Sequence, residues 1–194
     1  MTGLISQQKK SATHNYFYPV QSMLKLVLLV SALLPFVIWA TDADNDLLVA
    51  TSSGLIQGHY NVAGVREWKG VPYAKPPVGS LRWQYPQPPE PWNETYDASF
   101  DAPGCPQECK LPPGNCPEYG ISEDCLYLTV TSPVSPPPGD GYPVFFWIHG
   151  GAFEQGLGNC ALYNATQFAI DGVVSVVINY RLGALGFMVR PLPT

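Results

Sequence analysis

Charge is scarce in this chain, and no basic cluster is present. Lys, Arg, Asp and Glu together make up 13% of the 194 residues, and the longest basic run is the pair Lys9-Lys10. Fifteen acidic but only seven basic residues follow residue 40, so that part of the chain carries a net charge of −8. A nucleic-acid partner is therefore excluded, because its phosphates would be repelled. Hydrophobic residues make up 46%, which excludes a disordered polar tail.

The middle of the sequence has little room for long helices. Seventeen of the 21 prolines lie between Pro72 and Pro143, and proline removes an amide donor and breaks helices. No internal repeat is visible. We therefore expect one domain over residues 41–194 that spends much of its length in ordered loops.

An apolar run of 15 residues, 26–40, directly follows Lys25. A basic flank, a short apolar segment and a small residue at its end are typical of a secretory signal peptide. The alternative is a signal anchor, which would hold the chain in the membrane through 26–40 and leave residues 1–25 cytoplasmic. A bilayer span needs about 20 residues, which favours the signal peptide. Met23 would be a tidier start than Met1. Both interpretations place the rest of the chain outside the cell or in the endomembrane lumen.

Cysteine usage agrees with an oxidising compartment. Four of the five cysteines lie within 21 residues, at Cys105, Cys109, Cys116 and Cys125. Their spacing contains no CxxC pair and no histidine is near, so two disulfides are favoured over a zinc site, with three pairings open. Cys160 stands apart, as a free thiol or an intermolecular link. Two glycosylation sequons, at Asn93 and Asn164, fit a secreted chain.

The early part of the domain predicts short strands and a long coil. Residues 47–60 alternate loosely around a Ser53-Gly54 break, which predicts antiparallel strands, and 62–69 offers another. The proline-rich text of residues 70–91 predicts a coil without regular structure. Residues 126–130 form a further strand candidate.

The later part of the domain has a different pattern. Residues 144–148 and 173–178 are continuously apolar, which predicts strands covered on both faces. Residues 161–172 offer a helix, with Asn164 and Gln167 as a capping box and Gly172 at its C-terminal end. Strand, helix and strand predict a right-handed βαβ crossover.

Directly after the first of these strands comes His149-Gly150-Gly151-Ala152-Phe153. Adjacent glycines at a strand end let the backbone turn sharply and leave N–H groups unpaired, as an oxyanion requires. An HGGG-type loop has this role in α/β-hydrolases. A plain glycine-rich turn is the alternative.

The surrounding motifs resemble the type-B carboxylesterase family, which also includes cholinesterases and neuroligin-like adhesion proteins. The matching stretches follow the family's order, and they are residues 54–58, 68–74, 76–79, 81–83, 91–92, 105–107, 122–128, 147–151 and 179–183. The resemblance covers residues 47 to 188. It implies the N-terminal part of an α/β-hydrolase fold, with a mixed, mostly parallel central sheet and a small antiparallel N-terminal sheet.

The resemblance also implies roles for individual residues. The N–H groups of Gly151 and Ala152 would bind the oxyanion, while Gly150 gives the loop room. Ala152 stands where many relatives have a third glycine, so its methyl group narrows the acyl side. The bridge Cys105–Cys125 would match the family's first disulfide, and Cys109 and Cys116 would then pair inside it. Arg82 and Glu123 match an ion pair of the family, and such a pair must be complete where it is buried. The alternative for each residue is an exposed surface charge.

Two further comparisons with the family concern the partner of Arg181 and the choice of substrate. Arg181 matches an arginine whose acidic partner lies beyond the nucleophile in the family. Tyr119 is the one aromatic residue in 106–124, which disfavours a choline ester as substrate.

The attacking group is missing from this sequence. No G-x-S-x-G occurs in it, and the triad's acid and histidine follow the serine in this fold. We therefore expect the N-terminal fragment of a secreted serine esterase for small-molecule carboxylic esters, inactive by itself. A fragment of a non-catalytic adhesion or structural relative, or a chain truncated as a decoy, is the alternative. No metal or organic cofactor is expected.

Overall fold

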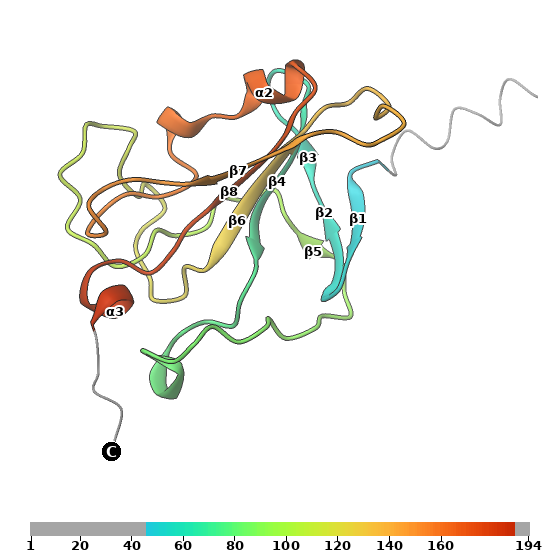
Figure 1. Cartoon of the computed structure of the whole chain (residues 1–194). Helices are drawn as coiled ribbons and strands as arrows, with labels where there is room; N and C mark the ends of the chain where they lie inside the picture. Colours follow the sequence, from blue (N-terminus) through green and yellow to red (C-terminus); the bar gives the residue numbers. More distant parts are fainter. Residues whose placement is uncertain (1–45, 189–194) are drawn as a thin grey trace, which may run out of the picture. The chain divides into compact units, whose positions relative to one another are not determined.

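A computed structural model describes residues 46–188, so the predicted leader at 26–40 and the two start candidates lie outside the described residues. Residues 46–188 belong to one compact unit. Figure 1 shows its two sheets and the loops that join them. In this part of the chain no helix is long and apolar enough to cross a membrane.

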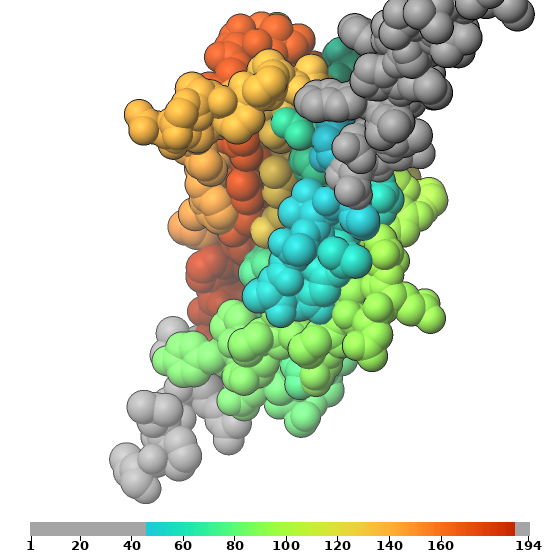
Figure 2. All heavy atoms as spheres, turned by 90° about the vertical axis from the view of Figure 1, so that its right-hand side faces the viewer, coloured from blue at the N-terminus to red at the C-terminus, as the bar shows by residue number. Residues whose placement is uncertain are grey.

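The small sheet has the order β1-β2-β5, with β1 at Leu48–Thr51, β2 at Gly54–Gln57 and β5 at Tyr96–Asp97. β1 and β2 pair antiparallel across the predicted break, and β5 joins β2 in parallel. Figure 2 views the face on which β1 and β2 lie. The core beneath is made by Ile56, Trp68, Val71 and Ala98.

The larger sheet has the order β3-β4-β6-β8-β7. Its strands are β3 at His59–Tyr60, β4 at Arg66–Pro72, β6 at Tyr127–Ser132, β7 at Val144–Ile148 and β8 at Val174–Ile178. The sheet is mixed, as expected. Among these strands only β7 and β8 pair in parallel, and the other three pairings are antiparallel.

The proline-rich segment contains more regular structure than its text predicts. Strand β4 continues to Pro72, and residues Gly79–Leu81 form the 3-10 helix η2. The expectation of a pure coil over 70–91 was therefore wrong at both places. Strand β4 can include Pro72 because a proline is tolerated at the end of a strand, where no further backbone hydrogen bond needs its missing N–H.

The connection between β7 and β8 holds two short helices. These are the 3-10 helix η3 at Ala161–Tyr163 and α2 at Thr166–Ile170. The N-cap of α2 is Ala165, which has no side-chain cap hydrogen bond. Asn164, one residue earlier, accepts the N–H of Thr166 at its Oδ1 at 2.9 Å, and Gln167 donates forward to Asp171 instead of back. Gly172 takes φ +84° after the helix, which suits glycine at this position. The prediction of a capping box was therefore wrong, because the helix begins one residue later than Asn164 would cap and Gln167 pairs with Asp171.

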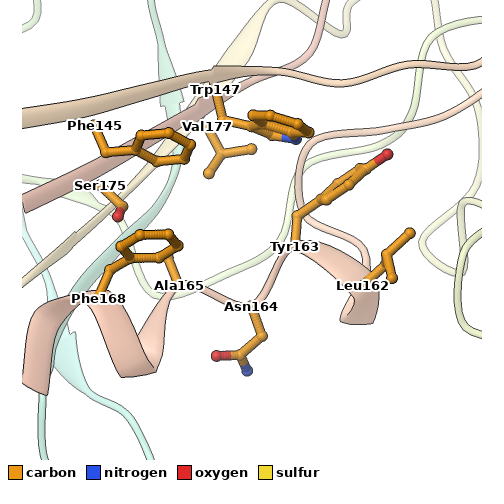
Figure 3. A pocket seen from close by; sticks show the side chains of 9 residues that line it. All are labelled: Phe145, Trp147, Leu162, Tyr163, Asn164, Ala165, Phe168, Ser175 and Val177. Atoms are coloured by element: carbon orange, nitrogen blue, oxygen red, sulfur yellow. The ribbon is translucent and has the colours of Figure 1, made fainter.

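α2 packs on the β7–β8 face through aromatic side chains (Figure 3). Phe168 stacks on Phe145 with ring centroids 4.9 Å apart, and Trp147 contacts Tyr163 at 5.4 Å. A cavity of about 230 Å³ remains between them, and fully buried Ser175 forms part of its wall. This face of β7 is therefore only partly covered.

The opposite face of β7 contradicts the expectation of a strand covered on both faces. Val144, Phe146 and Ile148 are 65%, 54% and 59% exposed, and within residues 46–188 no strand pairs with the outer edge of β7. β8 is the inner strand, because it pairs with both β6 and β7. In the described residues the unpaired edge at this end of the larger sheet is therefore the outer edge of β7.

Candidate functional site

The turn at His149–Phe153 begins at the carboxyl end of β7 and has an unusual backbone. Gly151, Ala152 and Phe153 have φ of 129°, 56° and 62°, so two non-glycine residues in succession are left-handed. The N–H groups of Glu154 and Gln155 both donate to the carbonyl of Gly151 at 3.1 Å and close the turn. The N–H groups of Gly151 and Ala152 donate to no acceptor within residues 46–188. Such strain persists only where neighbouring structure enforces it, which is typical of functional sites.

The two glycines of the turn have different reasons for lacking a side chain. A Cβ on Gly151 would overlap the carbonyl oxygen of Gln155, so glycine is required there. A Cβ on Gly150 would meet nothing within 4 Å. Packing therefore assigns the expected need for room to Gly151 and not to Gly150.

His149 anchors the start of the turn. Its side chain is 2% exposed and stacks on Tyr180 with ring centroids 4.4 Å apart. Nδ1 donates to the carbonyl of Gly150 at 2.8 Å, and the hydroxyl of Tyr180 donates to the carbonyl of His149 at 2.8 Å. Burial lowers the pKa of His149, which keeps the ring neutral. A neutral ring packed in this way serves to hold the turn.

Both disulfides join the cysteines that the family resemblance pairs. Cys105 is bonded to Cys125, and Cys109 is bonded to Cys116 inside that loop. Cys160 is a buried free thiol. The segment that the disulfides close, residues 105–125, lies against the turn at 149–153 and can therefore hold its conformation.

Gln107 makes that contact, and sequence reasoning assigned it no role. Its Oε1 accepts the N–H of Gly156 at 2.7 Å, and its Nε2 donates to the carbonyl of Gly156 at 2.8 Å and to that of Cys105 at 3.0 Å. Gln155 Oε1 accepts the N–H of Lys110 at 2.8 Å. In the sequence, only the family motif Cys105-Pro106-Gln107 draws attention to Gln107. The motif does not indicate that Gln107 contacts Gly156.

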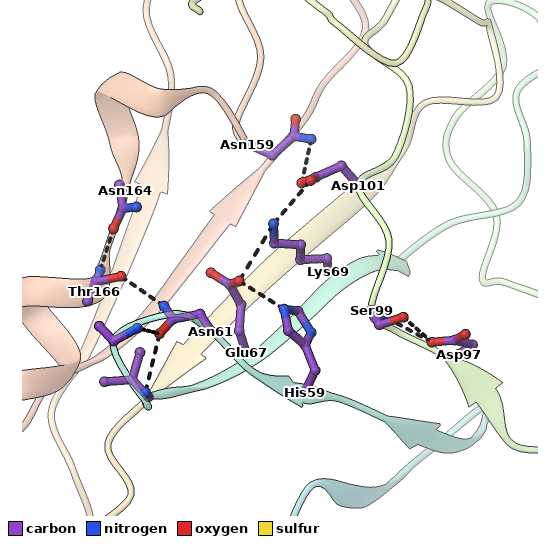
Figure 4. A network of polar contacts seen from close by, with 12 residues as sticks. His59, Asn61, Glu67, Lys69, Asp97, Ser99, Asp101, Asn159, Asn164 and Thr166 are labelled. Carbon is purple, nitrogen blue, oxygen red and sulfur yellow. Dashed lines mark hydrogen bonds and ion pairs between the residues drawn. The ribbon is translucent and has the colours of Figure 1, made fainter.

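The chain that leaves the turn is held by Asn179 and by a polar network. Asn179 Oδ1 accepts the N–H of Gly158 at 2.7 Å. Next to it, Asn159 Nδ2 donates to Asp101 at 3.0 Å, and Asp101 also binds the ammonium of Lys69 at 3.1 Å (Figure 4). Burial alone would lower the pKa of Lys69, but the hydrogen bond to Asp101 and the nearby acidic charges outweigh it and raise that pKa. These contacts fix residues 158–159, which no regular element supports.

The expected ion pair of Arg82 and Glu123 is formed, and it is partly exposed. Arg82 Nε donates to Glu123 Oε2 at 2.6 Å, while the side chains are 41% and 25% exposed. The guanidinium of Arg82 lies over the ring of Trp83, 5.6 Å from its centroid. The partner Glu123 lies two residues before Cys125, so the pair ties η2's loop to the outer disulfide.

Arg181 is differently placed. Its Nη2 donates to the carbonyl of Gln84 at 3.0 Å, and its Nη1 is buried without a partner among residues 46–188. An unpaired buried guanidinium nitrogen is costly. The position thus lacks an acceptor, as the family resemblance implies.

Both sequons lie at accessible positions, since Asn93 and Asn164 are exposed. Asn164 accepts the N–H of Thr166 through Oδ1, whereas a glycan would be attached to Nδ2. The two roles are compatible at one side chain. Within the described residues no group of three His, Cys, Asp or Glu side chains is arranged to hold a metal ion.

Two solved esterase structures share this arrangement. A thermophilic PNB esterase superposes with a TM-score of 0.68 at 44% identity, covering 74% of this chain and 29% of that one. A carboxylesterase of Geobacillus stearothermophilus gives a TM-score of 0.64 at 41% identity, covering 73% and 28%. The described sheet is therefore part of an α/β-hydrolase fold.

The sequence profile of the carboxylesterase family matches residues 45–191, and the chain belongs to this family. It is 46% identical over 148 residues to the "Crystal protein" of Dictyostelium discoideum and 44% identical over 143 residues to the para-nitrobenzyl esterase of Bacillus subtilis. These matches cover 76% and 73% of this chain. The chain spans 26% and 29% of the length of these two relatives.

Proposed function

We propose that this chain is the oxyanion-binding, N-terminal part of a secreted serine carboxylesterase. The observation that carries the proposal is the turn at 149–153, where the Gly151 and Ala152 amides are free at the end of a parallel strand. In the complete enzyme a serine attacks the ester carbonyl with histidine as base, and these amides hold the negative charge of the tetrahedral intermediate. Water then releases the acyl group.

The 194 residues alone contain no G-x-S-x-G serine, so we propose that they do not hydrolyse esters by themselves. The unpaired Nη1 of Arg181 and the bare outer face of β7 support a longer functional protein. We further propose that residues 26–40 direct the chain to the secretory pathway, by cleavage or as an anchor, and that Asn93 and Asn164 carry glycans.

The test is a chimera in which residues 46–188 replace the matched segment of the Bacillus subtilis relative. We expect this chimera to hydrolyse a para-nitrobenzyl ester and to react with a fluorophosphonate at the relative's serine. The native 194-residue chain should do neither. Labelling of the native chain by the fluorophosphonate would refute the proposed inactivity, and a folded chimera without turnover would refute the proposed oxyanion role.

A non-catalytic adhesion or structural role is the second candidate, because the family that the chain resembles also includes neuroligin-like adhesion proteins. It predicts the same folded chimera with no turnover. The chimera therefore separates the two functions by activity alone, with its circular dichroism spectrum as the control for folding.

A further inference from the structure

The oxyanion turn has no regular structure to support it. β7 ends at Ile148, and the next element, η3, begins at Ala161. Between them lie three successive positive φ values, which the isolated backbone would not keep. Contacts from elsewhere must hold this conformation.

Gln107 provides the most complete of these contacts. Its amide binds both the N–H and the carbonyl of Gly156, at 2.7 and 2.8 Å. The side chain thus makes the two hydrogen bonds that a neighbouring strand would make in a sheet. A third bond to the carbonyl of Cys105 at 3.0 Å fixes the amide relative to the outer disulfide. One N–H group and one carbonyl group, both of Gly156, thus depend on a side chain whose amide is fixed beside the outer disulfide.

Movement of Gly156 would reach the oxyanion amides because the turn is tightly closed. A Cβ on Gly156 would lie 2.6 Å from His149 Nδ1 and 2.7 Å from the carbonyl oxygen of Gly150. On the other side Gln155 abuts Gly151 so closely that Gly151 cannot carry a side chain. Residues 149–151 and 155–156 therefore move together.

We infer that Gln107 is a positioning residue for ester hydrolysis: through Gly156 it holds the turn that presents the Gly151 and Ala152 amides. This inference rests on the proposed function. The bond from Lys110 N–H to Gln155 Oε1 adds a second link from the bridged segment to the same turn. Gln107 touches no reacting atom, so its effect is on transition-state geometry.

The experiment uses the chimera with Gln107→Ala, and Gln87→Ala as the matched control. Gln87 is exposed, and its side chain donates only to the nearby carbonyl of Tyr85. We expect Gln107→Ala to lower kcat about 10- to 100-fold, because misplacement of a catalytic group by about 1 Å costs about 100-fold. KM should change less than about twofold, since the oxyanion forms only in the transition state. Gln87→Ala should leave both unchanged.

A pH profile distinguishes positioning from general loss of structure. In Gln107→Glu the ionised carboxylate opposes the carbonyl of Gly156, whereas the protonated acid donates to it. The ratio of kcat for Gln107→Glu to kcat for Gln107→Ala should therefore rise as the pH falls from about 6 to about 4.5, towards the ordinary glutamate pKa of about 4.3. A flat ratio, or a kcat for Gln107→Ala within twofold of the parent, overturns the inference.

An inactive parent chimera would refute the proposed function but not the role of Gln107. In that case hydrogen exchange of the Glu154 and Gln155 amides, which close the turn onto Gly151, still tests it. Gln107→Ala should accelerate their exchange, and the β8 amides serve as the internal reference. Unchanged exchange at residues 154 and 155 would overturn the inference.

Discussion

The bare outer face of β7 should make the isolated chain associate, and one substitution should reverse this. Val144, Phe146 and Ile148 are each more than half exposed on one side of an edge strand. Fully burying such a side chain contributes about 1.5–3 kcal/mol, so leaving about half of each in water forfeits about 1 kcal/mol per residue. The total of about 3 kcal/mol is a large share of a domain's usual net stability of about 5–15 kcal/mol.

The substitution is Phe146→Lys, which places a charge in the middle of the edge. Natural sheets use edge lysines in this way to prevent pairing between chains. In the isolated chain we expect more soluble monomer, measured by size-exclusion chromatography with light scattering over a concentration series. Tyr85→Lys, at a 90% exposed position in the coil, is the control and should leave association unchanged.

The same substitution should have the opposite effect in the chimera. If the rest of the enzyme covers this face, Phe146→Lys buries an unpaired charge and should lower the free energy of unfolding by about 3–5 kcal/mol, read from urea denaturation. A native isolated chain that is monomeric with a sharp two-state melt would refute the reasoning. So would a chimera whose stability does not respond to Phe146→Lys.

Four further outcomes follow from single side chains. Ala152→Gly should raise the stability of the chimera by about 1 kcal/mol in denaturant unfolding, because φ +56° strains alanine but not glycine; a loss of stability would contradict this. Burial lowers the pKa of His149, so the neutral ring contributes to the free energy of unfolding above its ordinary pKa, and this contribution is lost as the pH falls. The free energy of unfolding of His149→Phe should therefore depend less on pH between 7 and 5 than that of the parent. The hydrogen bond and charge of Arg82 lower the pKa of Glu123, so the ion pair contributes to the free energy of unfolding above the ordinary carboxyl pKa and this contribution is lost on further acidification. The free energy of unfolding of Glu123→Gln should show no such loss. A glycosidase should reduce the mass of the secreted chain, and Asn164→Gln should remove part of that shift; an unchanged mass would exclude a glycan there.

Local chemistry made much of the fold predictable. The Ser53-Gly54 break separates two antiparallel strands as expected, and Gly172 ends α2 with a positive φ. The two apolar runs form the neighbouring parallel strands β7 and β8, and α2 lies between them in the sequence. Each of these features depends on residues that are close in sequence, where turn and capping preferences decide the conformation.

Features that depend on distant partners were not predictable in the same way. The composition of residues 144–148 indicates a strand covered on both faces, but coverage depends on neighbours, and in the described residues β7 is an edge. β5 is only two residues long and forms because the chain passes β2. Gln107 gained a role only when Gly156, 49 residues later, was placed beside it. Sequence motifs identified the turn, while its support came from tertiary structure.

Three unsatisfied features of different chemistry support the same conclusion about the complete protein. The edge of β7 lacks a strand, its outer face lacks an apolar cover, and Arg181 Nη1 lacks an acceptor, all within residues 46–188. Hydrogen bonding, the hydrophobic effect and ion pairing are independent terms, so a single accidental defect would not produce all three. The turn at 149–153 differs from them, because its free amides are enforced by Gln107, Gly151 and the bridged segment. Under the proposed function, a longer chain would satisfy the first three and leave the turn's amides free for an ester oxyanion, which is the arrangement that catalysis requires.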